Sequence, residues 1–243
     1  MERHFHHELE ALRDRLSEMA GRAEIALVKS MEALKTRNAR LAEEVRAEDL
    51  AIDRIELEIE SQSLNFLGLQ QPVARDLRFL VAAIRISNDL ERIGDHAVNI
   101  AQSAAKLSGL PQSKPLEDLP MMAERTITML RDAVTAWLNG DAATARRICE
   151  RDVEIDGLKA KIFAKLSGGM IQSPESVPRN LELLLVSRNL ERVADLATNI
   201  AEEAIFVAEA RVIKHHAEEV AEGSPGGGVP GSGTPTAGRP ASR

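Results

Sequence analysis

Apolar residues in the first part of the chain recur at steps of three and four, the spacing of an amphipathic helix. This pattern predicts a helix over residues 5–33 and a second one over about residues 38–69, with Asn38 accepting a backbone N–H as its cap. Pro72 cannot lie in a helix interior, so it marks a short hairpin. A third helix then covers about residues 73–107. Three long helices with short connections predict an antiparallel bundle.

The central part of this third helix occurs twice in the chain. Residues 87–101 read SNDLERIGDHAVNIA and residues 187–201 read SRNLERVADLATNIA, so most positions are identical at an offset of 100. Upstream the match continues at an offset of 103, where two aspartates of the second helix align with Asp152 and Asp156. The repeat thus covers nearly the whole folded part of the chain, and the second half should repeat the bundle of the first.

The second half begins after a linker, because residues 110–120 hold several prolines with Ser and Lys between them. A turn at residues 140–141 starts the second helix of this half, and residues 168–178 form the following hairpin. The last helix runs over about residues 179–221. Residues 223–243 consist mostly of Gly, Pro, Ser and Thr without apolar periodicity, which predicts a disordered tail.

Composition favours an all-α fold. Hydrophobic residues make up 44% of the chain and charged residues 28%, which is globular composition, while aromatic residues make up only 2% and helix formers dominate. We therefore predict two tandem antiparallel three-helix bundles. The predicted boundaries are 1–109 for the first three-helix repeat, 110–120 for the linker, 121–222 for the second three-helix repeat and 223–243 for the tail.

Charge and targeting signals exclude several classes of protein. A net charge of −7 and a pI near 5.5 argue against a protein that mainly holds nucleic acid, which needs a basic face. The single cysteine, Cys149, cannot form an intramolecular disulfide and indicates a reducing compartment. No apolar run approaches the length of about 18 residues that a membrane span requires, and the N-terminus lacks the apolar core of a secretion signal. We expect a soluble cytoplasmic protein without membrane insertion.

Acidic side chains form a stripe on two helices of each half. Positions four apart share a helix face, so Glu91, Asp95 and Asn99 form one stripe, and the first hairpin brings it level with Asp49 and Asp53. Such an all-oxygen cluster suits hard divalent or trivalent cations. The candidate metal ligands are Asp49, Asp53, Glu91, Asp95 and Asn99 in the first half, and Asp152, Asp156, Glu191, Asp195 and Asn199 in the second.

Other interpretations of these residues remain open. The acids are alternatively a solvated face neutralised by Arg92 and Arg192, and the two asparagines alternatively cap or bridge helices. His96 aligns with Leu196, so a repeated site does not depend on it, and a surface or packing role is favoured. Cys149 has no companion base. A carboxylate-bridged di-metal enzyme normally requires Glu-x-x-His, which is absent, and so is a phosphate-binding glycine loop. We predict no enzyme and keep the di-metal enzyme and a purely structural helical repeat as alternatives.

The repeated LERIGDHAVNIA and LERVADLATNIA, the acidic pairs upstream and the QQPVARDLR hairpin resemble the PhoU family of phosphate-signalling regulators, over about residues 5–221. In that family E-x-x-x-D and D-x-x-x-D motifs bind metal clusters. The resemblance places these motifs at the eight candidate acids, all of which are present, with iron, magnesium, manganese or zinc as possible ions.

The resemblance also implies a function. It implies a cytoplasmic protein that tends to form homodimers and that negatively regulates phosphate uptake and the phosphate-starvation response. It would act as an adaptor between the ATPase subunit of the phosphate ABC transporter and the phosphate sensor histidine kinase, without binding nucleic acid.

Overall fold

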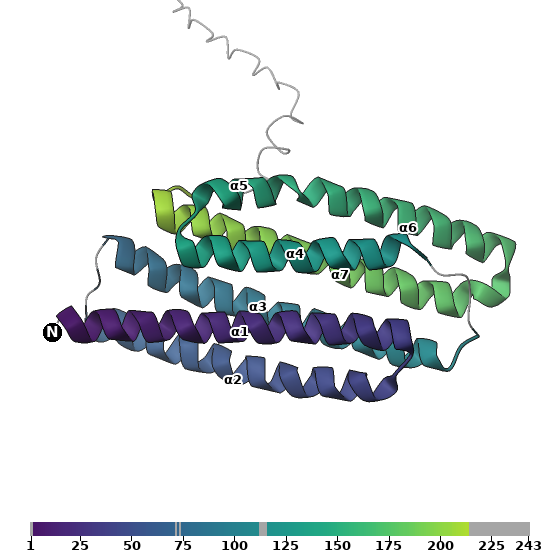
Figure 1. The fold of residues 1–243 in the computed structure, drawn as a ribbon, viewed down its shortest axis with the longest axis horizontal. Helices are drawn as coiled ribbons and strands as arrows, with labels where there is room; N and C mark the ends of the chain where they lie inside the picture. Colours follow the sequence, from purple (N-terminus) through teal and green to yellow (C-terminus); the bar gives the residue numbers. More distant parts are fainter. Residues whose placement is uncertain (1, 71, 73, 112–115, 214–243) are drawn as a thin grey trace, which may run out of the picture. The chain divides into compact units, whose positions relative to one another are not determined.

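The structure, a computed structural model, describes residues 2–70, 72, 74–111 and 116–213. No strand occurs in these ranges, which confirms the all-α prediction. In chain order the elements are α1 Glu2–Thr36, α2 Ala39–Leu69, α3 Ala74–Ser108, α4 Asp118–Asn139, α5 Ala142–Glu150, α6 Asp152–Gln172, the 3₁₀ turn η1 Pro174–Ser176 and α7 Val177–Glu209 (Figure 1). The first three helices form one bundle, and α4 to α7 form the other.

Local chemistry explains where the helices begin and end. The Asn38 side chain accepts a hydrogen bond from the backbone N–H of Arg40 at 3.0 Å, so the predicted cap of α2 is confirmed. Gly140 ends α4 with a φ of 65°, a left-handed conformation that glycine adopts without strain. Asp141 then caps α5, because its carboxylate accepts from the Thr144 N–H at 2.9 Å.

The predicted repeat is visible in the helix boundaries. The helix α2 begins at Ala39 and ends at Leu69, and the pair α5 and α6 begins at Ala142 and ends at Gln172, an offset of 103 at both ends. Only Arg151 separates α5 from α6, and its φ of −78° and ψ of −13° remain helical. The single second helix expected in this half is therefore present with a local interruption.

Three boundaries differ from the prediction. Helix α6 continues through Gly168 and Gly169, so the hairpin begins only at Ser173. Helix α4 begins inside the predicted linker, with Pro120 in its first turn, where a missing N–H leaves no helix bond unmade. Helix α7 ends at Glu209 rather than near residue 221, since Ala210 adopts a φ of 58°. The predicted end at 221 and the tail at 223–243 lie outside the described residues.

Helices α3 and α7 lie side by side and join the two bundles (Figure 1). They run antiparallel, because Arg85 in the first half of α3 pairs with Glu203 near the end of α7 at 2.8 Å, whereas Lys106 near the end of α3 pairs with Glu182 at 3.0 Å. Between these pairs, His96 Nδ1 lies 2.9 Å from Asn189 Oδ1. The histidine thus bridges the two bundles.

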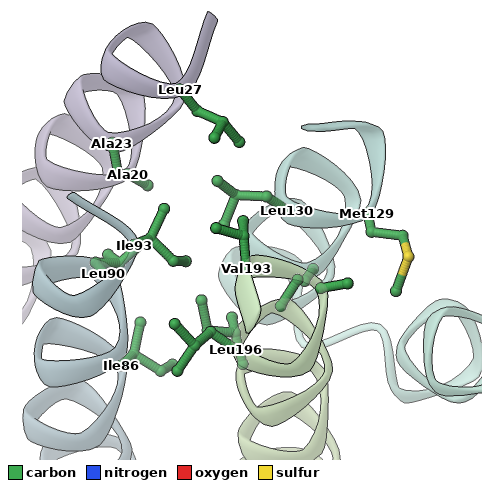
Figure 2. Packing of buried hydrophobic residues seen from close by; sticks show 14 of the residues in the cluster. Ala20, Ala23, Leu27, Ile86, Leu90, Ile93, Met129, Leu130, Val193 and Leu196 are labelled. Atoms are coloured by element: carbon green, nitrogen blue, oxygen red, sulfur yellow. The ribbon is translucent and has the colours of Figure 1, made fainter. Parts of the chain in front are cut away.

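One apolar core runs through both bundles. Figure 2 shows Leu27 of α1, Leu90 and Ile93 of α3, Leu130 of α4 and Val193 of α7 converging on it. All five side chains are almost completely buried. Burial of this kind stabilises the fold by about 1.5–3 kcal/mol for each large apolar side chain. Among the helices of the described ranges, none combines the length and the apolarity that a membrane crossing requires.

Candidate functional site

The first acidic cluster consists of Asp49 and Asp53 on α2 with Glu91 and Asp95 on α3. Gly94 brings the two helices close together here: a Cβ atom at this position would lie only 2.7 Å from Asp49 Oδ1. The same oxygen is buried and accepts no hydrogen bond. Because Gly94 has no side chain, the Asp49 carboxylate lies in the space that a Cβ atom would fill.

The first acidic cluster carries several negative charges with little compensation from cations: Arg46 lowers the pKa of Asp49, but less than burial and the neighbouring acids raise it. Burial, and then repulsion from Asp53 and Asp95, raises the pKa of Asp49 to about 6. Burial, and then repulsion from Asp95, Glu56 and the two aspartates of α2, raises the pKa of Glu91 to about 7. None of the four acids forms an ion pair with a Lys or Arg of the described chain.

Arg92, the arginine expected to neutralise this cluster, is directed elsewhere. It lies 3.8 Å from Asp89, one turn earlier on α3. Asp89 also receives a hydrogen bond from the Asn199 side chain of α7, so Asn199 lies at the contact between the bundles. Asn99 is exposed, and no described residue bonds to its side chain. Of the two predicted asparagine ligands, Asn199 thus has a bridging contact, and ligation by either stays a prediction.

The second acidic cluster consists of Asp152 and Asp156 on α6 with Glu191 and Asp195 on α7. Lys159 Nζ lies 2.5 Å from Glu191 Oε1, and Arg192 Nη1 lies 3.0 Å from Asp195 Oδ2. Asp152 is buried and Asp156 is exposed. The second acidic cluster therefore contains its own cations.

The two clusters differ in how well they fit a metal ion. In the described chain no three His, Cys, Asp or Glu side chains stand close enough to close around one ion, so binding would require carboxylate rotamers to turn inward. The first acidic cluster fits a hard cation on two counts: it offers oxygen donors alone, and the buried Asp49 Oδ1 has no hydrogen-bond partner. In the second, a lysine ammonium already contacts Glu191.

Two residues that distinguish the clusters were absent from the predicted site. Glu56 faces the first acidic cluster, and its equivalent at the offset of 103 is Lys159. Gly94 has Ala194 as its equivalent at the offset of 100. Both exchanges can be found by aligning the two halves of the sequence. Only the packing of α2 against α3 and of α6 against α7 shows that they lie at the acidic clusters.

No catalytic group emerges from Cys149. The thiol is buried, and burial raises its pKa to about 11, so it is scarcely ionised at neutral pH. This agrees with the expectation that it is not a nucleophile.

Comparison with known proteins identifies the family. The PhoU domain matches residues 16–104 and again residues 119–204. A protein from Zymomonas mobilis, named "Phosphate-specific transport system accessory protein PhoU homolog", is 37% identical over 204 residues, covering 84% of this chain and 86% of that protein. A homologue with the same name from Aquifex aeolicus is 36% identical over 216 residues, 88% of this chain and 98% of its own.

Solved structures agree with the sequence matches. The crystal structure of PhoU from Pseudomonas aeruginosa superimposes with a TM-score of 0.81 at 30% identity, over 85% of this chain and 100% of that one. PhoU from Streptococcus pneumoniae gives a TM-score of 0.80 at 27% identity, over 86% of this chain and 99% of that one. The two domain matches cover both bundles and the relatives align over most of their own length, so this chain belongs to the PhoU family.

Proposed function

We propose that this protein is an accessory protein of phosphate transport that negatively regulates phosphate uptake and the phosphate-starvation response. In this role it acts in the cytoplasm, as a homodimer, and links the ATPase subunit of the phosphate ABC transporter to the phosphate sensor histidine kinase. The observation that carries the proposal is the match of the PhoU domain to both halves, together with relatives named as phosphate-specific transport system accessory proteins.

The geometry supports an adaptor better than an enzyme. The architecture is two long helical bundles joined by α3 and α7, and its one thiol is buried with a raised pKa. Long helices expose extended faces, and an adaptor needs such faces to contact two partners at once.

Metal binding belongs to the same proposal. Asp49, Asp53, Glu91 and Asp95 would hold a hard cation, whose charge would offset their mutual repulsion and hold α2 against α3. The ion would supply structural stabilisation there. These residues have only carboxylate oxygens to offer, which suits iron, manganese or magnesium better than a structural zinc site.

The regulatory role is tested by deleting the gene in its host. Reporter output from a phosphate-starvation promoter and uptake of labelled phosphate are both measured in phosphate-rich medium. We expect both to rise in the deletion strain and to return to wild-type levels when this chain is supplied from a plasmid. The matched control is the empty plasmid, which should leave both readouts raised.

The outcome that contradicts the proposal is equally clear. If reporter output and phosphate uptake stay at wild-type levels after deletion, in a host without a second PhoU gene, the chain does not restrain the response. If uptake changes but the reporter does not, the link to the kinase is wrong and only the link to the transporter remains.

A further inference from the structure

Three exchanges between the two halves change the charge or the space around equivalent acids. At the offset of 103, Glu56 of the first half becomes Lys159. At the offset of 100, Gly94 becomes Ala194 and Asp89 becomes Asn189. Each exchange lies on a helix that carries one of the acidic clusters. Each leaves less negative charge or less space in the second half than in the first.

The exchange of Glu56 for Lys159 replaces a repelling carboxylate with a cation. Lys159 Nζ lies 2.5 Å from Glu191 Oε1, and the Glu191 side chain is only 13% exposed. Its other oxygen, Oε2, is buried without a hydrogen bond, so the lysine supplies the charge partner of a carboxylate that water scarcely reaches. In the first half, Glu91 faces Glu56 instead.

The exchange of Asp89 for Asn189 redirects an arginine. In the first half Arg92 pairs with Asp89 at 3.8 Å. In the second half the equivalent of Asp89 is the neutral Asn189, which bonds to His96, and Arg192 pairs with Asp195 at 3.0 Å. The second acidic cluster thereby gains an arginine that the first lacks.

The exchange of Gly94 for Ala194 removes space. The Asp49 carboxylate lies where a Cβ atom of residue 94 would be, 2.7 Å from Oδ1. Ala194 carries that Cβ atom and is completely buried. The second half thus lacks the bare Cα against which the first-half carboxylate rests.

We propose that metal binding is confined to the first acidic cluster, and that Lys159 serves the second as a permanent internal cation in place of a metal ion. This rests on the metal binding put forward above, but not on the regulatory role, so the two fail separately. The second bundle is then stable without metal, whereas the joint between α2 and α3 depends on it. The second half thus carries all four acids of the family motif and binds no metal ion.

The first test measures metal in the purified full-length chain. Apo protein is loaded with Mn²⁺ alone or with Fe³⁺ alone, passed over a desalting column and analysed for bound metal per chain. We expect Asp95→Asn to lower metal content strongly and Asp195→Asn to leave it at the wild-type level. An equal loss in both variants, or a wild-type chain that retains no metal, would overturn the proposal whatever the reporter assay gives.

The second test reverses two of the three exchanges, those that place Lys159 and Ala194 in the second acidic cluster. Lys159→Glu combined with Ala194→Gly restores the first-half residues at both positions. We expect this double variant to bind about twice as much metal as the wild type and to gain more in Tm from added metal. Lys161→Glu, an exposed lysine two positions along α6, makes the same change in charge and should not alter metal content. No gain in metal by a folded double variant would show that Lys159 does not exclude the ion.

A third measurement covers the case in which the double variant does not fold. Lys159→Met leaves Glu191 without its ammonium and should lower the Tm measured in chelator by several degrees, more than Lys161→Met does. If the two methionine variants melt together, Lys159 is not the internal cation, and the proposal is overturned.

Discussion

Asp89→Asn should make the stability of this protein less sensitive to pH. Asp89 lies on α3 at the contact with α7, and its side chain is only 13% exposed. Burial raises its pKa from 3.8 to about 6, because the Arg92 ion pair and the Asn199 hydrogen bond do not fully offset the loss of water and the nearby Glu203 and Glu202. The equivalent residue of the second half, Asn189, is already an amide.

The sign of the effect follows from the raised pKa. The folded protein holds the Asp89 proton more tightly than the unfolded chain does, so this carboxyl contributes stability that is fully present below pH 3.8 and is lost as pH rises to about 6. A pKa difference between 3.8 and about 6 corresponds to about 3 kcal/mol in the free energy of unfolding. The Asp89→Asn variant has no carboxyl at this position, so its free energy of unfolding does not fall by this amount as pH rises.

Thermal melts in chelator at pH 4.5, 6 and 7.5 measure the difference. For a chain of this size about 3 kcal/mol corresponds to about 6–12 °C in Tm. The variant should therefore melt close to the wild type, or slightly below it, at the lowest pH, and several degrees above it at the highest. Asp14→Asn, at an exposed position of α1, changes net charge equally and serves as the control.

A constant difference between the Asp89→Asn and wild-type melting temperatures across this pH range would refute the reasoning. It would mean that the carboxyl of Asp89 titrates alike in the folded and unfolded chain. A difference that grows with falling pH would mean that its charged form stabilises the fold, which reverses the predicted balance between burial and Arg92.

Two further predictions concern a glycine and the cysteine. Gly94→Ala places a Cβ atom 2.7 Å from Asp49 Oδ1, at the end of a side chain that must turn away, so it should weaken metal retention and cancel the gain in stability that alanine gives a helix. Gly21→Ala meets nothing within 4 Å and should stabilise the helix by up to about 1 kcal/mol; equal urea midpoints for both variants would contradict this. Cys149, with a pKa raised to about 11, should react with iodoacetamide far more slowly in the folded chain than in urea, as followed by mass spectrometry, and equal rates would show that the thiol is accessible.

Helix boundaries could be predicted from the sequence where a local signal decides them, and not where tertiary contact does. The Asn38 cap and the turn at Gly140 follow from the sequence because capping acts within a few residues. The prediction of a turn at residues 168 and 169 is wrong, because both glycines lie inside α6. A Cβ atom on Gly169 would lie 3.1 Å from Asn180 Nδ2, and this amide donates to the Leu166 carbonyl, so the glycine serves a close contact with α7 inside a continuous helix.

The candidate site shows a similar limit. Helical spacing and the hairpin are enough to predict that Asp49 and Glu91 face one another, since both follow from helix geometry. Whether an acid is neutralised depends on which cation lies across the helix pair. The repeat made the two halves look equivalent, because the acids match, while the difference lies in Lys159 and in the partner chosen by Arg192.

The stack between Phe79 of α3 and Trp137 of α4 gives the molecule a built-in optical reporter. The rings lie 5.2 Å apart and nearly parallel, with Trp137 only 4% exposed. The chain has one tryptophan and no tyrosine, so its ultraviolet emission originates at a single point, where the first bundle touches the second. Any ligand, ion or partner that shifts one bundle against the other changes the surroundings of that indole, and its fluorescence follows the movement without an attached dye.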